Sequence, residues 1–379
     1  MGRLEWFILE DDAGLRALEP EWRQLALSIA EPSIFHSPEW IQTWWAHFGA
    51  GRRLHLAGAR RDGRLVALAP LCTKRGRGGI RVREFLGSEE ADLAGFLLAP
   101  GEEALAPLLA RFVLEQPGWH LTDLWCLAAG SGSAEALGSA LRSGRARHEV
   151  STLTINPILD LRPDDWDAGA SRSMLKDLAR QRRVLGRQGK LALVFPNDLD
   201  EVEAALAELR ALHGARWSGQ GELSRLQLPD YWEWVRAIAR EAWRQGWLYL
   251  PRLVLGSQLI AVGLYFLYER RLFYWMGGHD PAFARHSPNL LVTLAVVEDL
   301  RVTRAADVLD FGRGDEWYKL RWTQASVTLQ RVMAWRGVRG SAAHVWRGRI
   351  RPWAWAHPEW SRPVRRFRRA VRRLAARAR

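Results

Sequence analysis

Residues 61–71 read RDGRLVALAPL, and residues 255–265, which follow 194 positions later, read LGSQLIAVGLY. Each stretch holds a turn between two runs of strand-forming residues, and this pattern predicts a β-hairpin whose second strand is largely buried. The repeats of a solenoid recur every ~20–50 residues, so a hairpin that recurs at the length of a whole domain indicates two copies of one domain.

The match continues on the N-terminal side of both hairpins. Glu39-Trp40 recurs as Glu233-Trp234 at the same offset. Each pair lies in a Trp-rich segment that predicts a helix, SPEWIQTWWAHFG in the first copy and LPDYWEWVRAIAREAWRQG in the second. The repeated unit is therefore a helix followed by a hairpin, which is typical of an α/β domain.

A chain of 379 residues is also long for a single core, because domains typically have ~100–200 residues. We expect two similar domains, at residues 1–160 and 161–345, followed by a basic tail at residues 346–379. The two cysteines, Cys72 and Cys126, lie in apolar, strand-like runs and are expected to be buried free thiols rather than a disulfide framework.

The second copy continues with a strand, a loop, a helix and a strand. We expect a strand at RLFYWMG (271–277), a helix from Asn289 to about Arg304, and a strand at ADVLDFG. A strand–helix–strand crossover makes its two strands parallel neighbours, so together with the hairpin it predicts a mixed sheet. Ser287 is the predicted N-cap of the helix and Pro288 its first residue, and such a helix N-terminus offers backbone N–H groups to anions.

The net charge of +13 is concentrated at one end of the chain. Nine arginines and no acidic residue lie in residues 362–379, and without them the net charge falls to +4. The apolar residues of this tail recur at helical spacing, which favours an amphipathic helix on an anionic membrane surface or an acidic partner. A solvated terminal helix is the alternative, and no specific nucleic acid is expected as a partner.

The beginning of the sequence bears on the location of the protein. The N-terminus, MGRLEWFILEDDAG, carries acidic residues where a signal peptide needs a basic start and an apolar run. No apolar run approaches the ~20 residues of a membrane-spanning helix. We expect a cytoplasmic protein, and the basic tail is the one feature that favours the inner face of the membrane.

Six cations recur every three or four residues between the two copies, where SRSMLKDLARQRRVLGRQGK (171–190) predicts a helix. Their spacing places them on one helical face. They are Arg172, Lys176, Arg180, Arg183, Arg187 and Lys190. Such a stripe suits a polyphosphate or an acidic polymer, or is simply a solvated face, and the sequence leaves both readings open.

The common catalytic motifs are absent from the sequence. There is no HExxH or CxxC motif and the ten histidines are scattered, so no metal site is expected. The GRG at 312–314 is not G-x-G-x-x-G, and there is no G-x-S-x-G nucleophile elbow.

Two clusters of chemically active residues remain. LHGARWSGQGE (212–222) places His213, Arg216 and Trp217 at the end of a predicted helix, next to a Gly-rich turn. Loops with these residue types are common binding sites, so we expect them to bind substrate. The alternative is an ordinary helix end with a buried tryptophan.

The second cluster is LDFGRGDEWYKLRW (309–322), at the exit of the last predicted strand. Asp315 or Glu316 is the candidate for accepting a proton from an amine or hydroxyl, Lys319 for pairing with a carboxylate or phosphate, and Tyr318 for contacting the substrate. Ion pairs within the loop, Arg313 with Asp315 or Glu316 with Lys319, are the structural alternative.

The order and spacing of these motifs resemble a known family. IFHSPEWIQTWWAHFG, LVALAPL, LARQRRVLGRQGKL, LHGARWSGQGE and LDFGRGDEWYKLRW together are similar to the CelD-like branch of the GNAT acyltransferases, associated with cellulose and exopolysaccharide biosynthesis and related to the FemAB-type aminoacyl transferases. The resemblance covers about residues 5 to 340. It implies tandem GNAT-like domains, in agreement with the repeat, each with a mixed β-sheet flanked by helices.

The resemblance also implies an activity and a donor site. It implies transfer of an acyl group, with acyl-CoA such as acetyl-CoA as donor, to an amine or hydroxyl of a small-molecule or saccharide acceptor. The donor pyrophosphate would lie at the helix N-terminus, near Arg285, Ser287, Asn289 and Leu290. The usual R/Q-x-x-G-x-G/A loop reads RHSPNL here. Aminoacyl transfer, or a non-catalytic binding role for the same scaffold, therefore stays open.

Overall fold

The computed structural model describes residues 2–144, 146–219 and 223–351. Residues 362–379, the part of the basic tail that carries the predicted amphipathic helix, lie outside these residues. Within them, no helix is both long enough and apolar enough to cross a membrane.

The elements follow the predicted order closely. The strands are β1 (Leu4–Leu9), β2 (Arg52–Arg61), β3 (Arg64–Arg75), β4 (Arg81–Phe85), β5 (Leu97–Leu98), β6 (Leu121–Ala128), β7 (Arg147–Asp160), β8 (Leu191–Val194), β9 (Leu248–Tyr249), β10 (Arg252–Leu255), β11 (Gln258–Tyr268), β12 (Arg271–His279), β13 (Val308–Asp310) and β14 (Ser326–Trp335). The helices are α1 (Asp12–Ala17), α2 (Glu19–Ser28), α3 (Pro38–Phe48), α4 (Ala106–Glu115), α5 (Gly132–Ser143), α6 (Arg172–Gly186), α7 (Leu199–Gly219), α8 (Pro229–Arg244), α9 (Pro288–Thr303) and α10 (Gly337–Val345).

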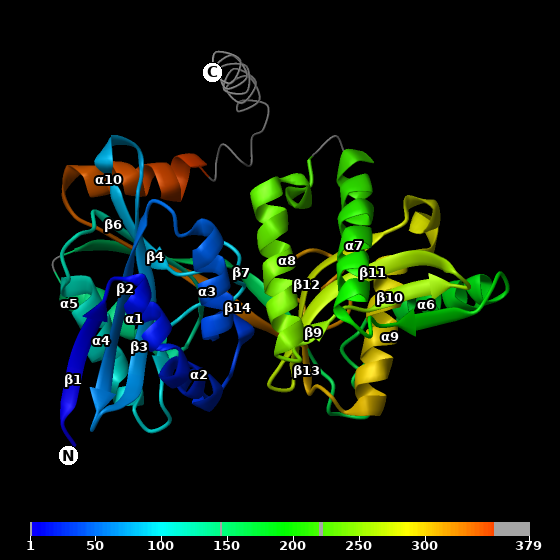
Figure 1. Ribbon diagram of the computed structural model, residues 1–379, viewed down its shortest axis with the longest axis horizontal. Helices are drawn as coiled ribbons and strands as arrows, with labels where there is room; N and C mark the ends of the chain where they lie inside the picture. Colours follow the sequence, from blue (N-terminus) through cyan, green and yellow to red (C-terminus); the bar gives the residue numbers. More distant parts are fainter. Residues whose placement is uncertain (1, 145, 220–222, 352–379) are drawn as a thin grey trace, which may run out of the picture.

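All fourteen strands of the described residues belong to one continuous mixed sheet. Its order is β1-β2-β3-β4-β6-β14-β7-β13-β12-β11-β10-β8, with β5 paired to β3 and β9 to β11. The order is nearly symmetrical about the β14–β7 pair, and the two halves appear as two lobes side by side in Figure 1. We call the half with β1–β6 the first lobe and the half with β8–β13 the second lobe.

Each predicted hairpin is present at its predicted place. In the first lobe Arg61 pairs with Arg64 across the turn, and in the second Leu255 pairs with Gln258. The β-α-β crossover is also present, because β12 runs parallel to β13 and α9 connects them. The predicted mixed α/β fold with two similar halves is confirmed.

The two lobes meet through equivalent helices. Trp40 of α3 and Trp234 of α8 occupy matching positions in the repeat, and their rings make an edge-to-face contact with centroids 5.5 Å apart. Both indoles are fully buried. Pairs of this kind contribute about 0.5–1.5 kcal/mol beyond the area that they bury. The repeated Glu-Trp pair is thus a mark of the surface on which the two lobes pack.

Strands β7 and β14 join the lobes. Strand β7 pairs with β14 along most of its length and then, at Ile158–Asp160, with β13 of the second lobe. Strand β14 comes after the whole second lobe in sequence, yet it pairs with β6 of the first. The division into domains at 160/161 and 345/346 stays a prediction, because backbone hydrogen bonds run across the middle of the molecule without a break.

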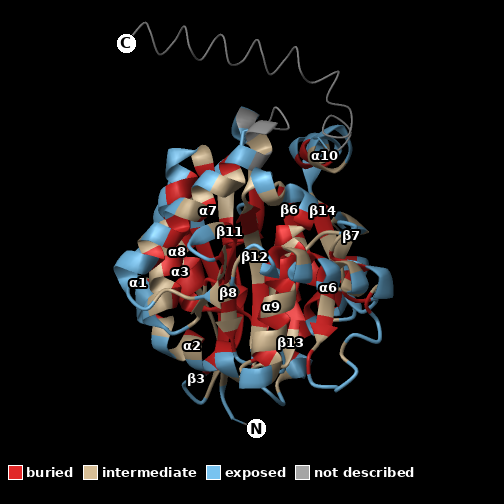
Figure 2. Cartoon of the chain, turned by 90° about the vertical axis from the view of Figure 1, so that its right-hand side faces the viewer, coloured by how far each residue is buried: buried red, intermediate tan, exposed pale blue. Residues whose placement is uncertain are grey.

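The interior is arranged around this sheet. In Figure 2 the strands and the inner faces of the helices are buried, and the outer faces of the helices are exposed. One apolar cluster spans the first lobe and the α7–α8 side of the second, and another lies between the second lobe's sheet and helices α6 and α9. Cys72 and Cys126 are buried and free, as predicted.

Candidate functional site

The parallel strands of each lobe separate after a short run of pairing. In the second lobe β12 pairs with β13 from Arg271 to Phe273, opposite Val308 to Asp310. The next residue on each strand, Tyr274 and Phe311, then lines a pocket of about 190 Å³. The separation of two parallel strands thus opens a cavity inside the sheet of the second lobe.

The N-terminus of α9 forms one wall of this pocket. Ser287, Asn289 and Leu290, three of the four predicted donor-binding residues, line it together with Thr293. The N–H groups of Leu290 and Leu291 donate to the carbonyl of Ser287, at 3.0 and 3.1 Å. A helix N-terminus carries a partial positive charge, so this wall suits an anionic or carbonyl group.

Two polar residues at the N-terminus of α9, Ser287 and Asn289, are not arranged as in an ordinary N-cap. Ser287 precedes the helix as predicted, but its backbone is left-handed (φ 53°, ψ 50°), and its side chain makes no capping hydrogen bond within the described residues. The Oδ1 atom of Asn289 is buried and has no hydrogen-bond partner in the described part of the chain. A buried acceptor without a donor costs free energy, and a bound N–H group at this wall would satisfy it.

Aromatic residues from the 311–322 segment form the opposite wall. Trp317, Tyr318 and Trp322 line the pocket, and Phe311 stacks on Trp322 with ring centroids 6.3 Å apart. The indole of Trp317 is 67% exposed, unusual for so large an apolar side chain. Tyr318 was predicted to contact substrate and lies in the pocket. The tryptophans were part of the same motif but had no predicted role.

The carboxylates of this segment point elsewhere. Asp315 is exposed, and the side chain of Glu316 is 52% exposed and pairs with Lys319 at 2.9 Å. Lys319 is buried, and its Nζ also donates to the carbonyls of Gly312 (3.3 Å) and Arg313 (2.8 Å). All three donors of the ammonium group are therefore used within the loop, and in this structure Lys319 holds the loop together.

Arg313 anchors the same segment to the first lobe. Its guanidinium donates to the carbonyls of Ser88 and Glu89, at 3.5 and 3.0 Å, and its Nε lies 3.2 Å from Oδ1 of Asp92. It also lies over the ring of Trp125, 4.8 Å from the centroid. The ion pair of Arg313 is thus with Asp92 of the other lobe rather than with Asp315.

Asp92 is the residue that sequence analysis missed. An ideal Cβ on Gly312 would lie 2.6 Å from Oδ2 of Asp92 and 3.2 Å from the carbonyl oxygen of Tyr274. The carboxylate is therefore next to the point where β12 and β13 separate. Burial raises the pKa of Asp92 to about 6, against the opposing effect of Arg313. Nothing in the local sequence marks Asp92, because its partners come from the other lobe.

His213, Trp217 and Arg285 are not among the residues that line the pocket. Nδ1 of His213 is 2.8 Å from Oγ of Ser224, and Trp217 donates to Nε2 of the same histidine at 3.2 Å. Both lie near the end of α7, whose backbone at His213 passes directly over Gly278 of β12. The side chain of Arg216 lies outside the described residues. Arg285 is exposed, and its Nε donates to His286 at 3.0 Å.

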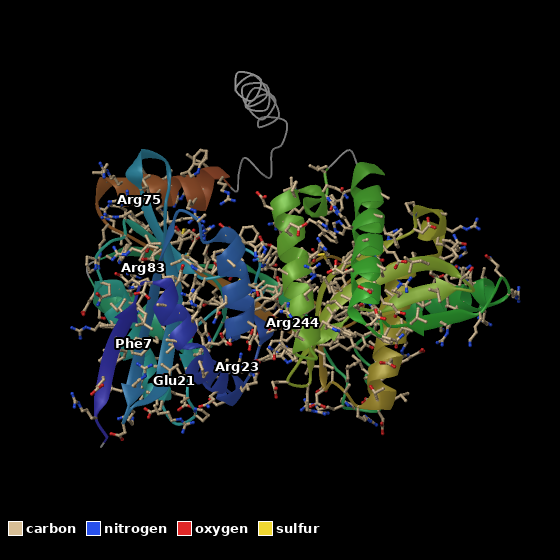
Figure 3. All side chains as sticks on the ribbon, viewed as in Figure 1. Phe7, Glu21, Arg23, Arg75, Arg83 and Arg244 are labelled. Carbon is tan, nitrogen blue, oxygen red and sulfur yellow. The ribbon has the colours of Figure 1, made fainter. Side chains whose placement is uncertain are left out.

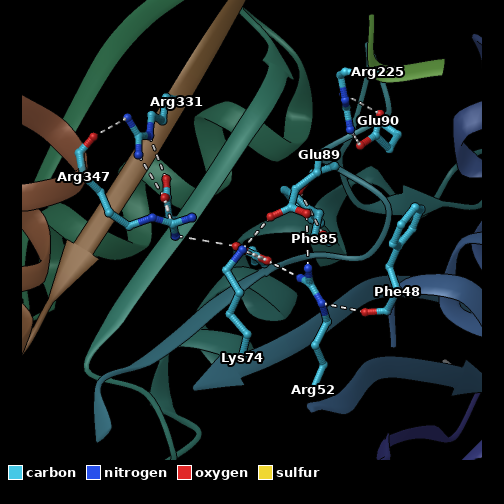
Figure 4. Close-up of polar contacts among 12 residues, drawn as sticks. Phe48, Arg52, Lys74, Phe85, Glu89, Glu90, Arg225, Arg331 and Arg347 are labelled. Carbon is cyan, nitrogen blue, oxygen red and sulfur yellow. Dashed lines mark hydrogen bonds and ion pairs between the residues drawn. The ribbon is translucent and has the colours of Figure 1, made fainter. Parts of the chain in front are cut away.

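The equivalent place in the first lobe is closed. Strand β4 pairs with β6 only at Val82 and Arg83, and the next residues on the two strands are Glu84 and Asp123, both buried. Glu84 accepts from Arg52 and Lys74, each at 2.6 Å. Figure 4 shows this network, which continues to Glu89, Arg331 and Arg347.

Asp123 is held in the same way from the other side. Arg331 of β14 and Arg347 both approach it at 2.7 Å. These cations keep the pKa of Asp123 below its usual value although burial acts in the opposite direction. Ion pairs therefore fill the strand separation of the first lobe, and the cavity of the second lobe is the candidate active site. In the described ranges no cluster of three or more metal-ligating side chains occurs.

Comparisons with known proteins agree with this placement. Residues 172–320, which include the whole cavity except Trp322, match the acetyltransferase (GNAT) domain family. No curated protein matches the chain.

Solved structures extend the likeness over most of the chain. A crystal structure of FemX is 13% identical with a TM-score of 0.58, over 83% of this chain and 95% of that one. The C-terminal domain of a putative lysylphosphatidylglycerol synthetase from Agrobacterium fabrum is 12% identical with a TM-score of 0.54, over 86% and 94%. At these identities the likeness is one of fold. Residues 172–320 of the second lobe thus match a GNAT domain, and over most of its length the chain has a fold similar to those of FemX and of the synthetase domain.

Proposed function

We propose that this protein is an acyltransferase that moves an acyl group from a CoA thioester to an amine or hydroxyl of a saccharide or other cell-envelope precursor. The observation that carries the proposal is the cavity between β12 and the 311–322 segment, with the N-terminus of α9 as its wall. The family match over residues 172–320 supports it.

The cavity suits the reactive end of a thioester. Its walls are largely apolar and aromatic, and its polar lining residues include Ser287, Asn289, Thr293 and His279. The unpaired Oδ1 of Asn289 would accept an N–H from the amide-containing arm of CoA, and the helix N-terminus would face the pyrophosphate. The indole of Trp317 would cover the bound arm and lose its exposure to water.

The chemistry needs few side chains. The acceptor nitrogen or oxygen attacks the thioester carbonyl carbon, a C–N or C–O bond forms, and the C–S bond breaks to release the CoA thiolate. The acceptor loses one proton and the thiolate takes one up. Backbone N–H groups at the separated strands would stabilise the oxyanion of the intermediate. A base is then required only to remove the proton of the acceptor.

We assign that base to Asp92 in preference to Asp315 or Glu316. Asp92 is beside the strand separation and has a pKa raised to about 6, close to the range in which a general base works best. Asp92 is itself paired with Arg313, but it is buried, whereas Asp315 and Glu316 are exposed. Replacing Asp92 by Asn should lower kcat about 100-fold or more without weakening donor binding, whereas Asp315→Asn and Glu316→Gln should not. The reverse pattern would restore the loop carboxylates as the base.

Calorimetric titration of the full chain with acetyl-CoA tests the donor site. We expect one binding site, and Asn289→Asp should weaken binding about tenfold or more, because it places a negative charge beside the pyrophosphate. Gln188→Glu, which adds the same charge at an exposed position beyond α6, is the matched control and should bind normally. Failure to bind acetyl-CoA or a longer acyl-CoA would favour a non-catalytic scaffold.

A second candidate, aminoacyl transfer from a polyanionic carrier, is favoured by one observation. Nδ1 of His286 contacts Oε1 of Gln181 on α6 at 2.7 Å, so α6 lies beside the loop that enters the pocket. The six predicted cations are all exposed there, although Arg180 also pairs with Asp177. FemX and the synthetase domain share this fold. Competition between acetyl-CoA and a charged transfer RNA for the chain would separate the two donors.

A further inference from the structure

A second set of hollows lies in the first lobe, away from the strand separations. Two adjoining hollows, of about 230 and 560 Å³, lie where β2 begins, β3 ends and β4 begins. Both are lined by Glu10, Arg53, His55 and Arg81, so they form one concave surface. Its size is that of a small-molecule site, which is typically about 300–1,000 Å³.

The strand register gathers arginines on this surface. Arg53 is opposite Thr73, Thr73 is opposite Arg83, and Arg75 is opposite Arg81. Directly opposed residues of antiparallel strands share a face of the sheet, and so do residues two apart on one strand. All four arginines line the smaller hollow, whose lining has Glu10 as its one carboxylate. Figure 3 labels Arg75 and Arg83, both in the first lobe.

Arg83 is a buried cation that is attracted by the charge of Glu10 but forms no ion pair with it. Only 2% of the residue is exposed, and among the described residues no carboxylate forms an ion pair with it. Its Nη atoms donate to the carbonyl of Val113 (3.1 Å), in the last turn of α4, and to that of Pro117 (2.9 Å), just beyond the helix, and its Nε has no partner in the described residues. Burial lowers its pKa to about 10. A buried charge in this situation is stabilised by an anion.

Two neighbours leave further polar atoms unsatisfied. The Nε atom of Arg81 and the Nε2 atom of His55 are buried without a partner in the described part of the structure. His55 itself is 4% exposed. Glu10 cannot serve the whole cluster, because it already pairs with Arg53 and lies 3.4 Å from Nδ1 of His55. The two hydrogen bonds of Arg83 to the carbonyls of Val113 and Pro117 cap the end of α4. Capping does not explain why three further arginines, Arg53, Arg75 and Arg81, line the same hollow.

We propose that this surface binds the oxyanion group, phosphate or carboxylate, of a small soluble ligand. Guanidinium groups of Arg53, Arg81 and Arg83 would hold the oxygens, since the planar fork of arginine matches such groups. The larger hollow would take the rest of the ligand. The site is independent of the proposed acyl transfer, because it belongs to the lobe whose strand separation is closed.

Titration of the full chain with inorganic phosphate and, separately, with succinate tests the proposal. The informative variant is Arg53→Ser with Arg81→Ser, which leaves the α4 contacts of Arg83 intact. Arg64→Ser, at an exposed position on β3 outside both hollows, is the matched control. We expect saturable binding of at least one anion, weakened about tenfold or more in the double variant and unchanged in the control. The anion that binds more tightly shows whether the site prefers a phosphate or a carboxylate group.

Thermal unfolding gives a second measure of anion binding that does not depend on the titration. An anion that binds the folded state raises Tm with concentration in the parent chain and the control, and less in the double variant. Equal binding and equal Tm shifts in all three proteins, or saturation by neither anion, would overturn the proposal. Acetyl-CoA should bind the double variant as it binds the parent chain. Absence of anion binding in the first lobe can therefore be distinguished from absence of donor binding in the second.

Discussion

At the level of single residues, the two lobes meet beside the candidate cavity at Gly312. This glycine has φ 70°, and its missing side chain leaves room for the carboxylate of Asp92. A Cβ there would come within 2.6 Å of Oδ2 of Asp92 and would also strain the backbone. The first lobe thus places a buried acid next to Gly312, beside the strand separation of the second lobe, although Asp92 is not one of the residues that line the cavity.

Asp92 should give the stability of the protein a recognisable pH dependence. Its pKa is raised to about 6, so between about pH 4 and pH 6 the folded state keeps a proton that the unfolded state has lost. The free energy of unfolding therefore falls as pH rises through this window, by at most about 3 kcal/mol, and Asp92→Asn removes this fall. The measurement is denaturant unfolding of both proteins at pH 4 and pH 7.5.

The exposed Asp315→Asn variant is the control for that comparison. The difference in free energy of unfolding between Asp315→Asn and the parent chain should be the same at both pH values. The Asp92→Asn variant should be more stable relative to the parent chain at pH 7.5 than at pH 4. If the free energy of unfolding changed with pH in the same way in all three proteins, Asp92 would have an ordinary pKa.

Some of the residues predicted from the sequence line the candidate cavity, and their role in binding stays a prediction. Ser287, Asn289, Leu290 and Tyr318 line the cavity because each belongs to a motif whose position in the fold was legible. Asp92 could not be found, because its environment is built by residues more than 200 positions away. Lys319 has the chemistry of a binding residue, but its donors are taken by the loop carbonyls, and no sequence pattern reports that.

At the scale of elements, the 311–322 segment performs two structural tasks. Its aromatic residues form a wall of the cavity, and Arg313 ties it to the first lobe at Ser88, Glu89 and Asp92. The sequence predicted a loop at the exit of a parallel strand. The ion pairing with the opposite lobe is the part that it could not predict.

Replacing Arg313 by Ala should destabilise the protein and loosen this segment. It leaves the buried Asp92 without its cation, and loss of one partner of a largely buried pair costs about 3 kcal/mol. Chemical unfolding measures the change in stability. Hydrogen exchange should show faster exchange in peptides covering 311–322. Arg321→Ala, which removes a cation of the same segment that lies over Trp317, should change stability by about 0.5 kcal/mol or less.

Loss of stability without any change in exchange at 311–322 would contradict this account of the segment. So would an effect of Arg321→Ala as large as that of Arg313→Ala.

At the scale of the whole molecule, the two copies are one body. The repeat was visible in the sequence because hairpins and their Trp-rich helices have strong local patterns. The way the copies join was not visible, since β14 pairs with strands that precede the entire second lobe. Pairing between strands far apart in sequence is set by tertiary packing, which leaves little local signal.

The continuous sheet should unfold as a unit. We expect a single calorimetric transition for the full chain, because separating the lobes breaks the β7–β13 pairing and exposes the Trp40–Trp234 contact. The fragment 161–325 should be poorly soluble, since it lacks β7 and leaves β13 as an open edge. Two well-separated transitions, or a soluble and folded 161–325, would show that the lobes are independent.

The central claim is that the strand separation of the second lobe holds the acyl donor while that of the first is closed. A crystal structure of the chain with desulfo-CoA tests it most directly. The account predicts the amide-containing arm between β12 and the 311–322 segment, with the pyrophosphate at the N-terminus of α9 and an amide N–H on Asn289. Binding between β4 and β6, where Glu84 and Asp123 now lie, or at any place outside the second-lobe cavity, would contradict it.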